Sequence, residues 1–349
     1  MILNNPNYIH FVITLKGDGI YGRCLKERNV KVYNLNLNNP LNFVYVGYKI
    51  TKIICSLEPD VLHTWMYHSN LLGGIIGKIL GYKKIIWSIH GSFHTSSTKF
   101  FTMLIIRISA FFSYLIPENI IYVSNFAKDR HNEIGYSKKK AMIINNGFTH
   151  DEFFTPFNMR NKYLFDFKLP DNIKIIGVVS RFHPVKGYDY LIKALSQLRI
   201  KFYNFKCICV GIDISSNNDF MTLVHKYKLE NHIISLGIRN DVPMLMSLFD
   251  VLVLPSVSES FPNVLLEAMA SGTPCISTDV GDASHIIEKT GWIVPVADSV
   301  SLEYSIMKAF EEMENIKNWE KRSLDCINRI EDKFSFREMN NSYKQLWNF

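Results

Sequence analysis

Residues 250–278 read DVLVLPSVSESFPNVLLEAMASGTPCIST. The apolar run at 250–254 predicts a buried strand, which a loop connects to the next element. A helix is predicted at 262–271, because serine and proline stand at its start and glycine follows its end. Proline then opens a second strand at 274–278. A strand, a helix and a strand in this order are typical of a parallel sheet covered by helices.

The same alternation extends outward over the whole chain of 349 residues, a length that suggests two domains at roughly 100–200 residues each. Alternating strands and helices imply parallel sheets that are covered on both faces, hence an α/β fold. A polar stretch with two prolines at 149–171 is the best linker candidate, and residues 299–349 are predicted to be mostly helical. The predicted strands are 8–15, 30–36, 84–89, 119–123, 141–145, 173–180, 205–210, 232–236, 250–254, 274–278 and 292–294, and the predicted helices are 68–80, 125–134, 187–199, 218–228, 241–248 and 262–271.

The composition is that of a globular protein, with 47% hydrophobic and 20% charged residues. The six cysteines are too few and too scattered for a disulfide framework or a zinc cluster. Cys207 and Cys209 are expected as buried thiols on one face of a strand, and a reducing cytosol fits this pattern. The N-terminus has neither a basic region nor a long apolar core, so no secretory signal is expected.

Charge is unevenly distributed along the chain. The net charge is +7, yet residues 1–155 hold 17 Lys and Arg against 9 Asp and Glu, which gives them +8. Such an asymmetry predicts that the first half meets something anionic, with a drift in surface composition as the alternative. We expect no nucleic-acid partner.

One segment, KFFTMLIIRISAFFSYLI at 99–116, is mostly apolar but carries Arg107 in its middle. A spanning helix needs about 20 apolar residues, and a central arginine costs several kcal/mol there. The segment is therefore interpreted as a helix that packs in the core or contacts a membrane interface, rather than one that spans a bilayer.

A glycine motif at 17–22, GDGIYG, matches the GxGxxG dinucleotide fingerprint and follows a predicted strand. The fingerprint requires a carboxylate about 20 positions later, at the end of the next strand. Residues 34–39, NLNLNN, contain none. The pattern therefore favours turn glycines over a dinucleotide site.

Two carboxylates stand beyond the predicted strand at 250–254. Ligands of open α/β sheets bind beyond the carboxyl ends of strands, and helix starts attract phosphate. Glu259 lies in the loop and Glu267 in the predicted helix, where both are suited to accept hydrogen bonds from vicinal hydroxyls of a sugar. The alternative is an acid that stabilises the helix dipole, together with a solvated glutamate, and this stretch alone leaves both open.

A second element favours a binding site. The predicted strand at 173–180 ends in SRFHPVKG, which places Arg181 and Lys186 between a strand and a helix. Arginine offers a fork to phosphate oxygens and lysine a mobile point charge. Together they suit a pyrophosphate, including one that leaves with accumulating negative charge.

These residues resemble the retaining glycosyltransferases of family 4, which have the GT-B fold of two Rossmann-like domains facing across a cleft. The segment from Glu259 to Glu267 resembles the E-x7-E motif of that family. Arg181 and Lys186 resemble its R-x4-K pair. The runs SGTPCISTDVGDASHII at 271–287 and GWIVP at 291–295 are also similar. The resemblance is strong from about 118 to 298.

The resemblance implies that the chain is divided into three parts. Residues 1–158 would form an acceptor-side Rossmann-like domain, residues 159–330 a nucleotide-sugar-binding domain, and residues 331–349 a helix that returns to the first domain. Many family members begin with a strand, a Gly-Gly loop and a helix that precede the segment resembling residues 8–36. The N-terminal domain is therefore expected to lack its first βα unit.

The resemblance also implies a role for each site residue. Glu267 would hold the ribose of a nucleotide sugar, while Glu259 would contact the donor sugar near the reacting carbon. The backbone of Phe261, Pro262 and Asn263 would approach the sugar and phosphates. Arg181 and Lys186 would stabilise the departing diphosphate. His90 would contact the donor sugar, and Arg239 would lie near the base.

The function expected from the resemblance is retaining transfer of a sugar from a nucleotide-diphosphate donor to a glycan or lipid-linked acceptor, in cell-surface polysaccharide synthesis. No Asp-x-Asp pair stands in the sequence, so we expect no metal and no cofactor beside the nucleotide sugar. The basic half would face the acceptor or an anionic membrane, which predicts a cytoplasmic protein peripheral to the plasma membrane. A sugar-nucleotide epimerase of the same fold and an inactive donor-binding partner subunit are the alternatives.

Overall fold

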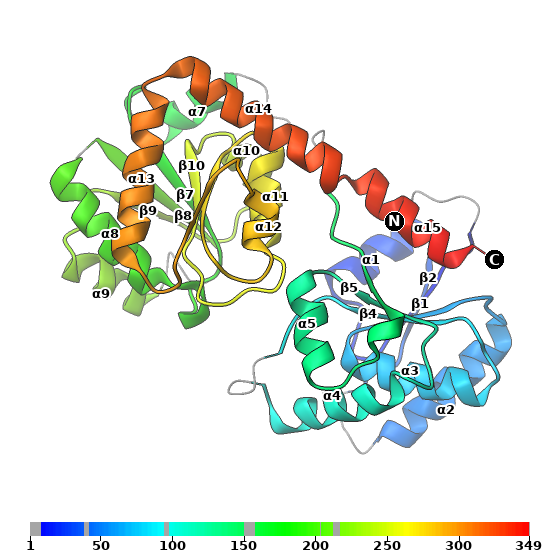
Figure 1. The fold of residues 1–349 in the computed structure, drawn as a ribbon. Helices are drawn as coiled ribbons and strands as arrows, with labels where there is room; N and C mark the ends of the chain where they lie inside the picture. The colour runs from blue at the N-terminus through cyan, green and yellow to red at the C-terminus, as the bar shows by residue number, and fades with distance from the viewer. Residues whose placement is uncertain are drawn as a thin grey trace. The chain divides into compact units, whose positions relative to one another are not determined.

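The computed structural model describes residues 8–37, 42–93, 98–149, 158–202, 204–211 and 217–348 (Figure 1). Contacts divide the chain into two compact units. The first unit comprises Met1–Val123, Ala127–Ile144 and Tyr343–Phe349, and the second comprises Ser124–Phe126 and Asn145–Ser342. Each unit thus combines segments that are distant in sequence. The domain limits expected from the sequence, 1–158, 159–330 and 331–349, divide the chain into continuous segments instead, and they stay predictions.

The second unit is built on a parallel sheet of six strands in the order β12-β11-β10-β7-β8-β9. The chain adds β8 and β9 to one side of β7, then returns to add β10, β11 and β12 to the other side. The strand order therefore reverses between β7 and β10. These strands are β7 (Lys174–Val179), β8 (Phe205–Val210), β9 (Ile233–Leu236), β10 (Val251–Leu254), β11 (Cys275–Thr278) and β12 (Trp292–Val294).

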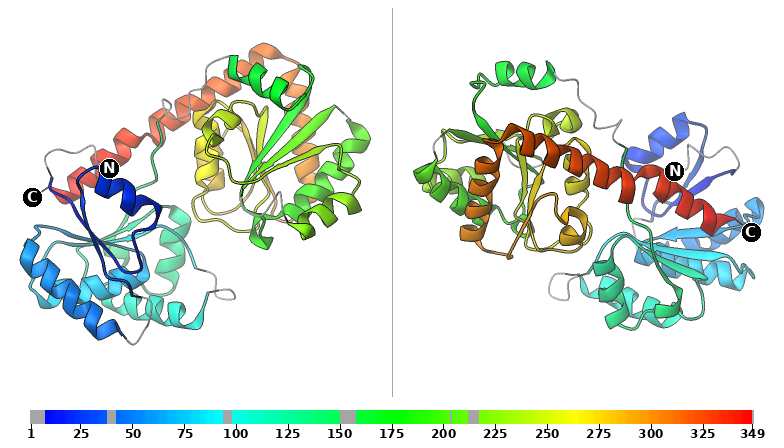
Figure 2. Two further views of the ribbon diagram at one scale, coloured as in Figure 1. Left: turned by 180° about the vertical axis from the view of Figure 1, so that it is seen from behind. Right: turned by 45° about the horizontal axis from the view of Figure 1, so that its top comes forward.

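Helices cover both faces of this sheet (Figure 2). One face packs on α8, α9 and α13 around a core that includes Leu195, Phe220 and Ile306, and the other face packs on α10, α11 and α12. The helical elements are α7 (Asn158–Asp166), the short 3-10 helix η4 (Pro184–Lys186), α8 (Tyr188–Lys201), α9 (Asn218–Lys226), α10 (Val242–Met246), α11 (Asn263–Ala270), α12 (Ala283–Ile287), α13 (Ser299–Met313), α14 (Ile316–Lys333) and α15 (Phe336–Trp347), whose last residues join the first unit.

The first unit holds two parallel sheets, a pair β1-β2 and a four-stranded sheet β3-β4-β5-β6. Strand β4 reads IIWSI and is buried throughout, as a central strand covered on both faces should be. The elements are β1 (Phe11–Thr14), α1 (Gly19–Glu27), β2 (Lys31–Asn34), α2 (Phe43–Leu57), β3 (Leu62–Trp65), α3 (Tyr67–Ile79), β4 (Ile85–Ile89), α4 (Phe100–Phe112), β5 (Asn119–Tyr122), α5 (Asn125–Glu133), η3 (Lys138–Lys140) and β6 (Ala141–Ile143).

The predicted α/β class with parallel sheets in two parts is confirmed. The eleven predicted strands all occur, with ends shifted by up to three residues. The sequence prediction did not include β3, whose four residues LHTW include the polar His and Thr, nor the helices α1, α2 and α12. The proposed linker at 149–171 contains a helix, α7, whose Tyr163 is buried.

Three smaller expectations concern single features. Cys207 and Cys209 are fully buried on one face of β8, with their sulfur atoms 3.8 Å apart. The glycine motif begins in the loop after β1 and continues into the first turn of α1, and β2 ends at Asn34, whose amide donates to Asp18 over 3.4 Å. An amide thus stands where the dinucleotide fingerprint requires a carboxylate. Within the described ranges, no helix is long and apolar enough to cross a membrane.

Candidate active site

Two loops of the second unit meet beside the point where its strand order reverses. The loop after β7 carries Arg181 and Lys186, and the loop after β10 carries Glu259. Because β7 and β10 are parallel neighbours, their carboxyl ends lie at the same edge of the sheet. A reversal of strand order leaves a crevice at that edge, which is where open α/β sheets bind ligands.

Close backbone contacts fix the two loops to each other. The amide of Val257 donates to the carbonyl of Val185 over 2.9 Å. Gly187 follows η4 with φ +67°, and a Cβ there would lie 1.9 Å from the carbonyl oxygen of Pro255. Glycine is therefore required at 187, both for the left-handed backbone and for the approach of the two loops.

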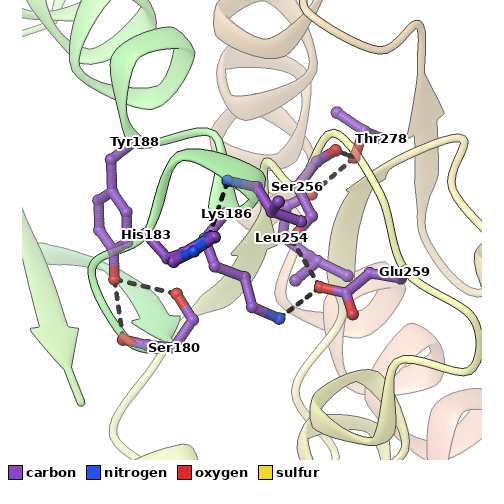
Figure 3. Close-up of polar contacts among 9 residues, drawn as sticks. Ser180, His183, Lys186, Tyr188, Leu254, Ser256, Glu259 and Thr278 are labelled. Carbon is purple, nitrogen blue, oxygen red and sulfur yellow. Dashed lines mark hydrogen bonds and ion pairs between the residues drawn. The ribbon is translucent and has the colours of Figure 1, made fainter. Parts of the chain in front are cut away.

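Lys186 and Glu259 form an ion pair across these loops (Figure 3). The Nζ atom of Lys186 lies 2.6 Å from Oε1 of Glu259, and the hydroxyl of Ser256 donates to the same oxygen over 2.8 Å. The two charged side chains are 24% and 16% exposed, so water screens the pair only partly. In the described part of the chain, Oε2 of Glu259 makes no hydrogen bond, which leaves it available to a ligand hydroxyl.

The end of β11 and the loop after it support the Glu259 loop from its other side. The hydroxyl of Thr278 donates to the carbonyl of Ser256 over 2.5 Å (Figure 3), and the amide of Asp282 donates to the carbonyl of Ser260 over 3.1 Å. Gly281, with φ +56°, passes so close that a Cβ there would lie 2.4 Å from the Ser260 oxygen. Three loops from neighbouring strands thus hold the backbone around Glu259.

Helix α11 begins directly after this loop. Pro262 is its N-cap and supplies no side-chain hydrogen bond, so the first backbone N–H groups of the helix are left without a capping side chain. These groups and the positive end of the helix dipole favour an anion. Phe261 and Pro262 are buried, whereas Asn263 is exposed at the helix start.

The Glu267 carboxylate lies about one turn further along α11. Burial raises the pKa of Glu267 above its ordinary value. No hydrogen bond to this carboxylate occurs within the residues that the structure describes. Glu267 is only half-buried, so its carboxylate stays accessible and is suited to accept from hydroxyls of a bound molecule.

Arg239, after β9, is held in place by a second ion pair. Its Nε and NH2 atoms lie 2.8 Å and 2.6 Å from the two carboxylate oxygens of Asp241. The hydroxyl of Tyr163 donates to Asp241 over 2.7 Å. The hydrogen bonds from Arg239 are the main cause that lowers the pKa of Asp241 to about 2. Sequence reasoning missed Tyr163 and Asp241, since nothing in the pattern links α7 to this loop.

A cavity of about 550 Å³ opens where these elements meet. This volume lies within the range of about 300–1,000 Å³ that is usual for small-molecule sites. The structure therefore brings together seven of the nine predicted site residues. The predicted residues that line the cavity are Arg181, Lys186, Arg239, Glu259, Phe261, Pro262 and Asn263.

The two other predicted residues lie elsewhere. Glu267 belongs to the same helix as Asn263 but is not among the described residues that line the cavity. His90 belongs to the first unit, directly after β4, where its ring stacks on Trp65 with 4.6 Å between centroids. The hydroxyl of Tyr343 lies 3.5 Å from Nε2 of His90, and burial lowers the pKa of His90 to about 4. His90 is therefore a neutral imidazole at physiological pH.

The cavity presents a distinct set of chemical groups. Arg181 and Lys186 supply two cations, the start of α11 supplies free amides, and Glu259 supplies a free carboxylate oxygen. Cations and amides suit phosphate oxygens, while the carboxylate suits sugar hydroxyls. A molecule that carries both a diphosphate and a sugar fits this set.

Comparison with known proteins agrees with this chemistry. A family model described as "Glycosyl transferases group 1" matches residues 159–324, and one described as "Glycosyltransferase Family 4" matches residues 9–152. The UDP-Gal:alpha-D-GlcNAc-diphosphoundecaprenol alpha-1,3-galactosyltransferase of Escherichia coli is 23% identical over 90% of this chain and 81% of its own length.

Two solved structures share the fold. HepE of Anabaena, solved in complex with UDP, superposes with a TM-score of 0.84 at 19% identity, over 96% of this chain and 90% of its own. A glycosyltransferase from Rickettsia africae superposes with a TM-score of 0.81 at 22% identity, over 97% of this chain and 89% of its own. These superpositions show the GT-B fold. Because the two family models together match most of its length, the chain belongs to the family 4 glycosyltransferases.

Proposed function

We propose that this enzyme transfers a sugar from a UDP-sugar to a hydroxyl of a glycan or lipid-linked saccharide, with retention at the anomeric carbon and without a metal ion. The observation that carries the proposal is the Lys186–Glu259 pair. It joins a group suited to phosphate and a group suited to sugar at the edge of the sheet where ligands bind. The uridine base rests on the relatives, one of which is named for UDP-Gal and another of which is solved with UDP.

The geometry of the pair allows both partners to contact the donor. A lysine ammonium has three N–H donors and Glu259 takes one of them, so two remain for diphosphate oxygens. Glu259 accepts from Lys186 and Ser256 through Oε1, and its Oε2 is free for a hydroxyl of the donor sugar. The ion pair thus positions both side chains before the donor arrives, which lowers the cost of ordering them.

The reaction breaks the bond between the anomeric carbon and the diphosphate oxygen, and forms a bond from that carbon to the acceptor oxygen. The bonding electrons leave with the diphosphate, whose negative charge rises, and the proton of the acceptor hydroxyl leaves with it. Lys186, Arg181 and the free amides of α11 stabilise this charge where a metal would otherwise do so. No carboxylate is assigned as a covalent nucleophile.

The remaining roles follow the family resemblance. Glu267 holds the ribose hydroxyls, Arg239 lies near the base, and the backbone of Phe261, Pro262 and Asn263 approaches the phosphates and sugar. His90 contributes a neutral imidazole to the donor sugar. A cell-surface polysaccharide as product is supported by the Escherichia coli relative, whose name gives a diphosphoundecaprenol-linked acceptor.

A screen of nucleotide sugars tests the proposal. The full chain is mixed with UDP-glucose, UDP-galactose, UDP-N-acetylglucosamine and GDP-mannose, and both the melting temperature and the release of nucleoside diphosphate are measured. We expect one UDP-sugar to raise the melting temperature and to release UDP faster when a saccharide acceptor is added. If the chain binds none of these compounds, the proposal is overturned.

Product analysis separates the alternatives. An epimerase would convert the nucleotide sugar without an acceptor and would release no UDP. An inactive partner subunit would bind UDP yet transfer nothing to any acceptor. Retention is checked by the anomeric coupling constant of the product, and metal independence by unchanged turnover in a chelator.

A further inference from the structure

Helix α4 of the first unit is apolar on both of its sides. Ile106 and Ala110 pack into the core around Trp87, as an interior-facing stripe should. The opposite side of the same helix and its extension to residue 115 also carry large apolar side chains, and these are between 37% and 77% exposed. We call this surface the α4 face, made of Phe100, Phe101, Leu104, Ile108, Phe111, Tyr114 and Leu115.

The spacing shows that the α4 face is one continuous surface. Positions 101, 104, 108, 111 and 115 are three or four residues apart, the interval that places side chains on the same side of a helix. Monomeric proteins rarely expose contiguous apolar surface of this kind, and where they do it marks contact with a partner or a membrane.

Basic residues surround the α4 face. Arg107 is exposed in its middle and Lys99 at its start. At its far end, Nζ of Lys140 donates to the carbonyl of Tyr114 over 2.7 Å, which places η3 with its three lysines beside the face. Burial and the charge of Lys78 lower the pKa of Lys140.

Acidic residues are few near this surface. The sequence from 99 to 116 contains no Asp or Glu. Asp129 and Glu133 share a hollow with Lys138, and Glu133 pairs with Arg130. Glu118 is exposed just beyond this segment, but Lys99, Arg107 and the three lysines of η3 still make the charge around the α4 face net positive, which favours an anionic partner.

We propose that the α4 face docks the enzyme on an anionic lipid bilayer, with its aromatic side chains at the headgroup boundary. A helix with exposed apolar residues and flanking Lys and Arg lies in that boundary, and each basic residue near an anionic surface adds about 1 kcal/mol. The helix has 13 residues, about 20 Å at 1.5 Å each, which is too short to span a hydrocarbon core of about 30 Å.

A second copy of the chain is a less favourable occupant. A symmetric contact through the α4 face would bring the same patch of both copies together, and with it Arg107 and the η3 lysines of each. Like charges would then oppose each other at the edge of an apolar contact. A bilayer with anionic headgroups meets the apolar and the basic parts together.

The first experiment measures sedimentation of the full chain with vesicles of phosphatidylcholine and phosphatidylglycerol. The variant Phe101→Ser, Leu104→Ser, Phe111→Ser is expected to bind at least 100-fold more weakly, since burying each large apolar side chain contributes about 1.5–3 kcal/mol. The matched control is Phe165→Ser, Ile316→Ser, Leu324→Ser, which removes exposed apolar side chains of the second unit. Equal binding of both variants would overturn the proposal.

The second experiment tests the charge. Lys138→Ala with Lys139→Ala is expected to weaken binding about 30-fold, by the per-charge contribution above. Lys317→Ala with Lys321→Ala on α14 is expected to leave binding unchanged. Binding should fall with added salt and with vesicles of phosphatidylcholine alone. Binding that ignores lipid charge and salt contradicts the proposal.

Light scattering of the wild type without lipid separates a membrane from self-association. A monomer that binds vesicles supports the proposal. A dimer that the α4-face variant converts to a monomer, without any vesicle binding by the wild type, overturns it. Vesicle binding does not require turnover, so its failure is distinguishable from a failure of the proposed sugar transfer.

Discussion

Lys186 and Glu259 are 73 residues apart in the sequence, yet Nζ of one lies 2.6 Å from Oε1 of the other. Neither group is replaceable without leaving its partner partly buried and unpaired. The same contact that stabilises two loops therefore positions the two groups that the donor would meet.

Lys186→Ala is expected to lower the rate of transfer by at least 10²-fold, because loss of one preorganised charge at a developing anion has about that effect. The protein should stay folded, since the loops keep the Val257–Val185 hydrogen bond. UDP release and circular dichroism are the measurements, with Lys193→Ala on the exposed side of α8 as the control. Full turnover by Lys186→Ala would refute the assignment.

Glu267→Ala is expected to abolish transfer through loss of donor binding, because the ribose hydroxyls lose their acceptor. The fold should tolerate the change, since it removes a half-buried carboxylate that has no hydrogen-bond partner within the described residues. Isothermal calorimetry with UDP and thermal melting are the measurements, and the exposed Glu320→Ala is the control. An unchanged UDP affinity contradicts a role in binding.

Gly187→Ala should damage the site although Gly187 carries no side chain. The left-handed backbone alone costs about 1–2 kcal/mol with a side chain, and contact with the Pro255 oxygen adds to this. Gly135→Ala is the matched control, since Gly135 has φ +98° but no atom within 4 Å of an added Cβ. We expect both to lower the melting temperature and Gly187→Ala alone to weaken UDP binding. Equal UDP affinity in both variants would show that the loop contact is dispensable.

The first unit should lose stability in mild acid. Burial lowers the pKa of His63 to about 3, and those of His90 and His131 to about 4. Unfolded histidines take up protons near pH 6.5, whereas these folded ones do not. The stabilisation is thus complete above about pH 6.5 and is lost as the pH falls toward about 4, by roughly 1.4 kcal/mol per histidine and pH unit.

Hydrogen exchange measures this loss in each unit separately. Amides of β4 should lose protection between about pH 7 and pH 5, and His131→Gln should make that loss shallower. The exposed His225→Gln is the control, since its ring is 61% exposed. Protection of β4 that stays constant over this range would contradict the lowered pKa values.

The sequence by itself determined the class of fold and the chemistry of the site. Apolar runs such as 250–254 and 173–180 predicted strands because burial on both faces selects apolar residues, and that preference is local. The motif residues Arg181, Lys186 and Glu259 were identified for the same reason, since a βα loop beyond a buried strand is visible in the sequence. The strand β3 was missed because LHTW contains two polar residues and so lacks the apolar run that marks a buried strand.

Only the tertiary structure decided which of these loops meet. Periodicity carries no information on strand order. The order places β7 beside β10, although the first residues of the two strands, Lys174 and Val251, are 77 positions apart in the sequence.

That neighbourhood is decided by packing between segments far apart in the chain, which no local pattern records. It brings Lys186 to Glu259, requires glycine at 187, and ties Arg239 through Asp241 to Tyr163 in a stretch that the sequence suggested was a linker. The exposure of the α4 face is of the same kind. The sequence showed an apolar helix, and only the folded unit shows which of its sides is buried.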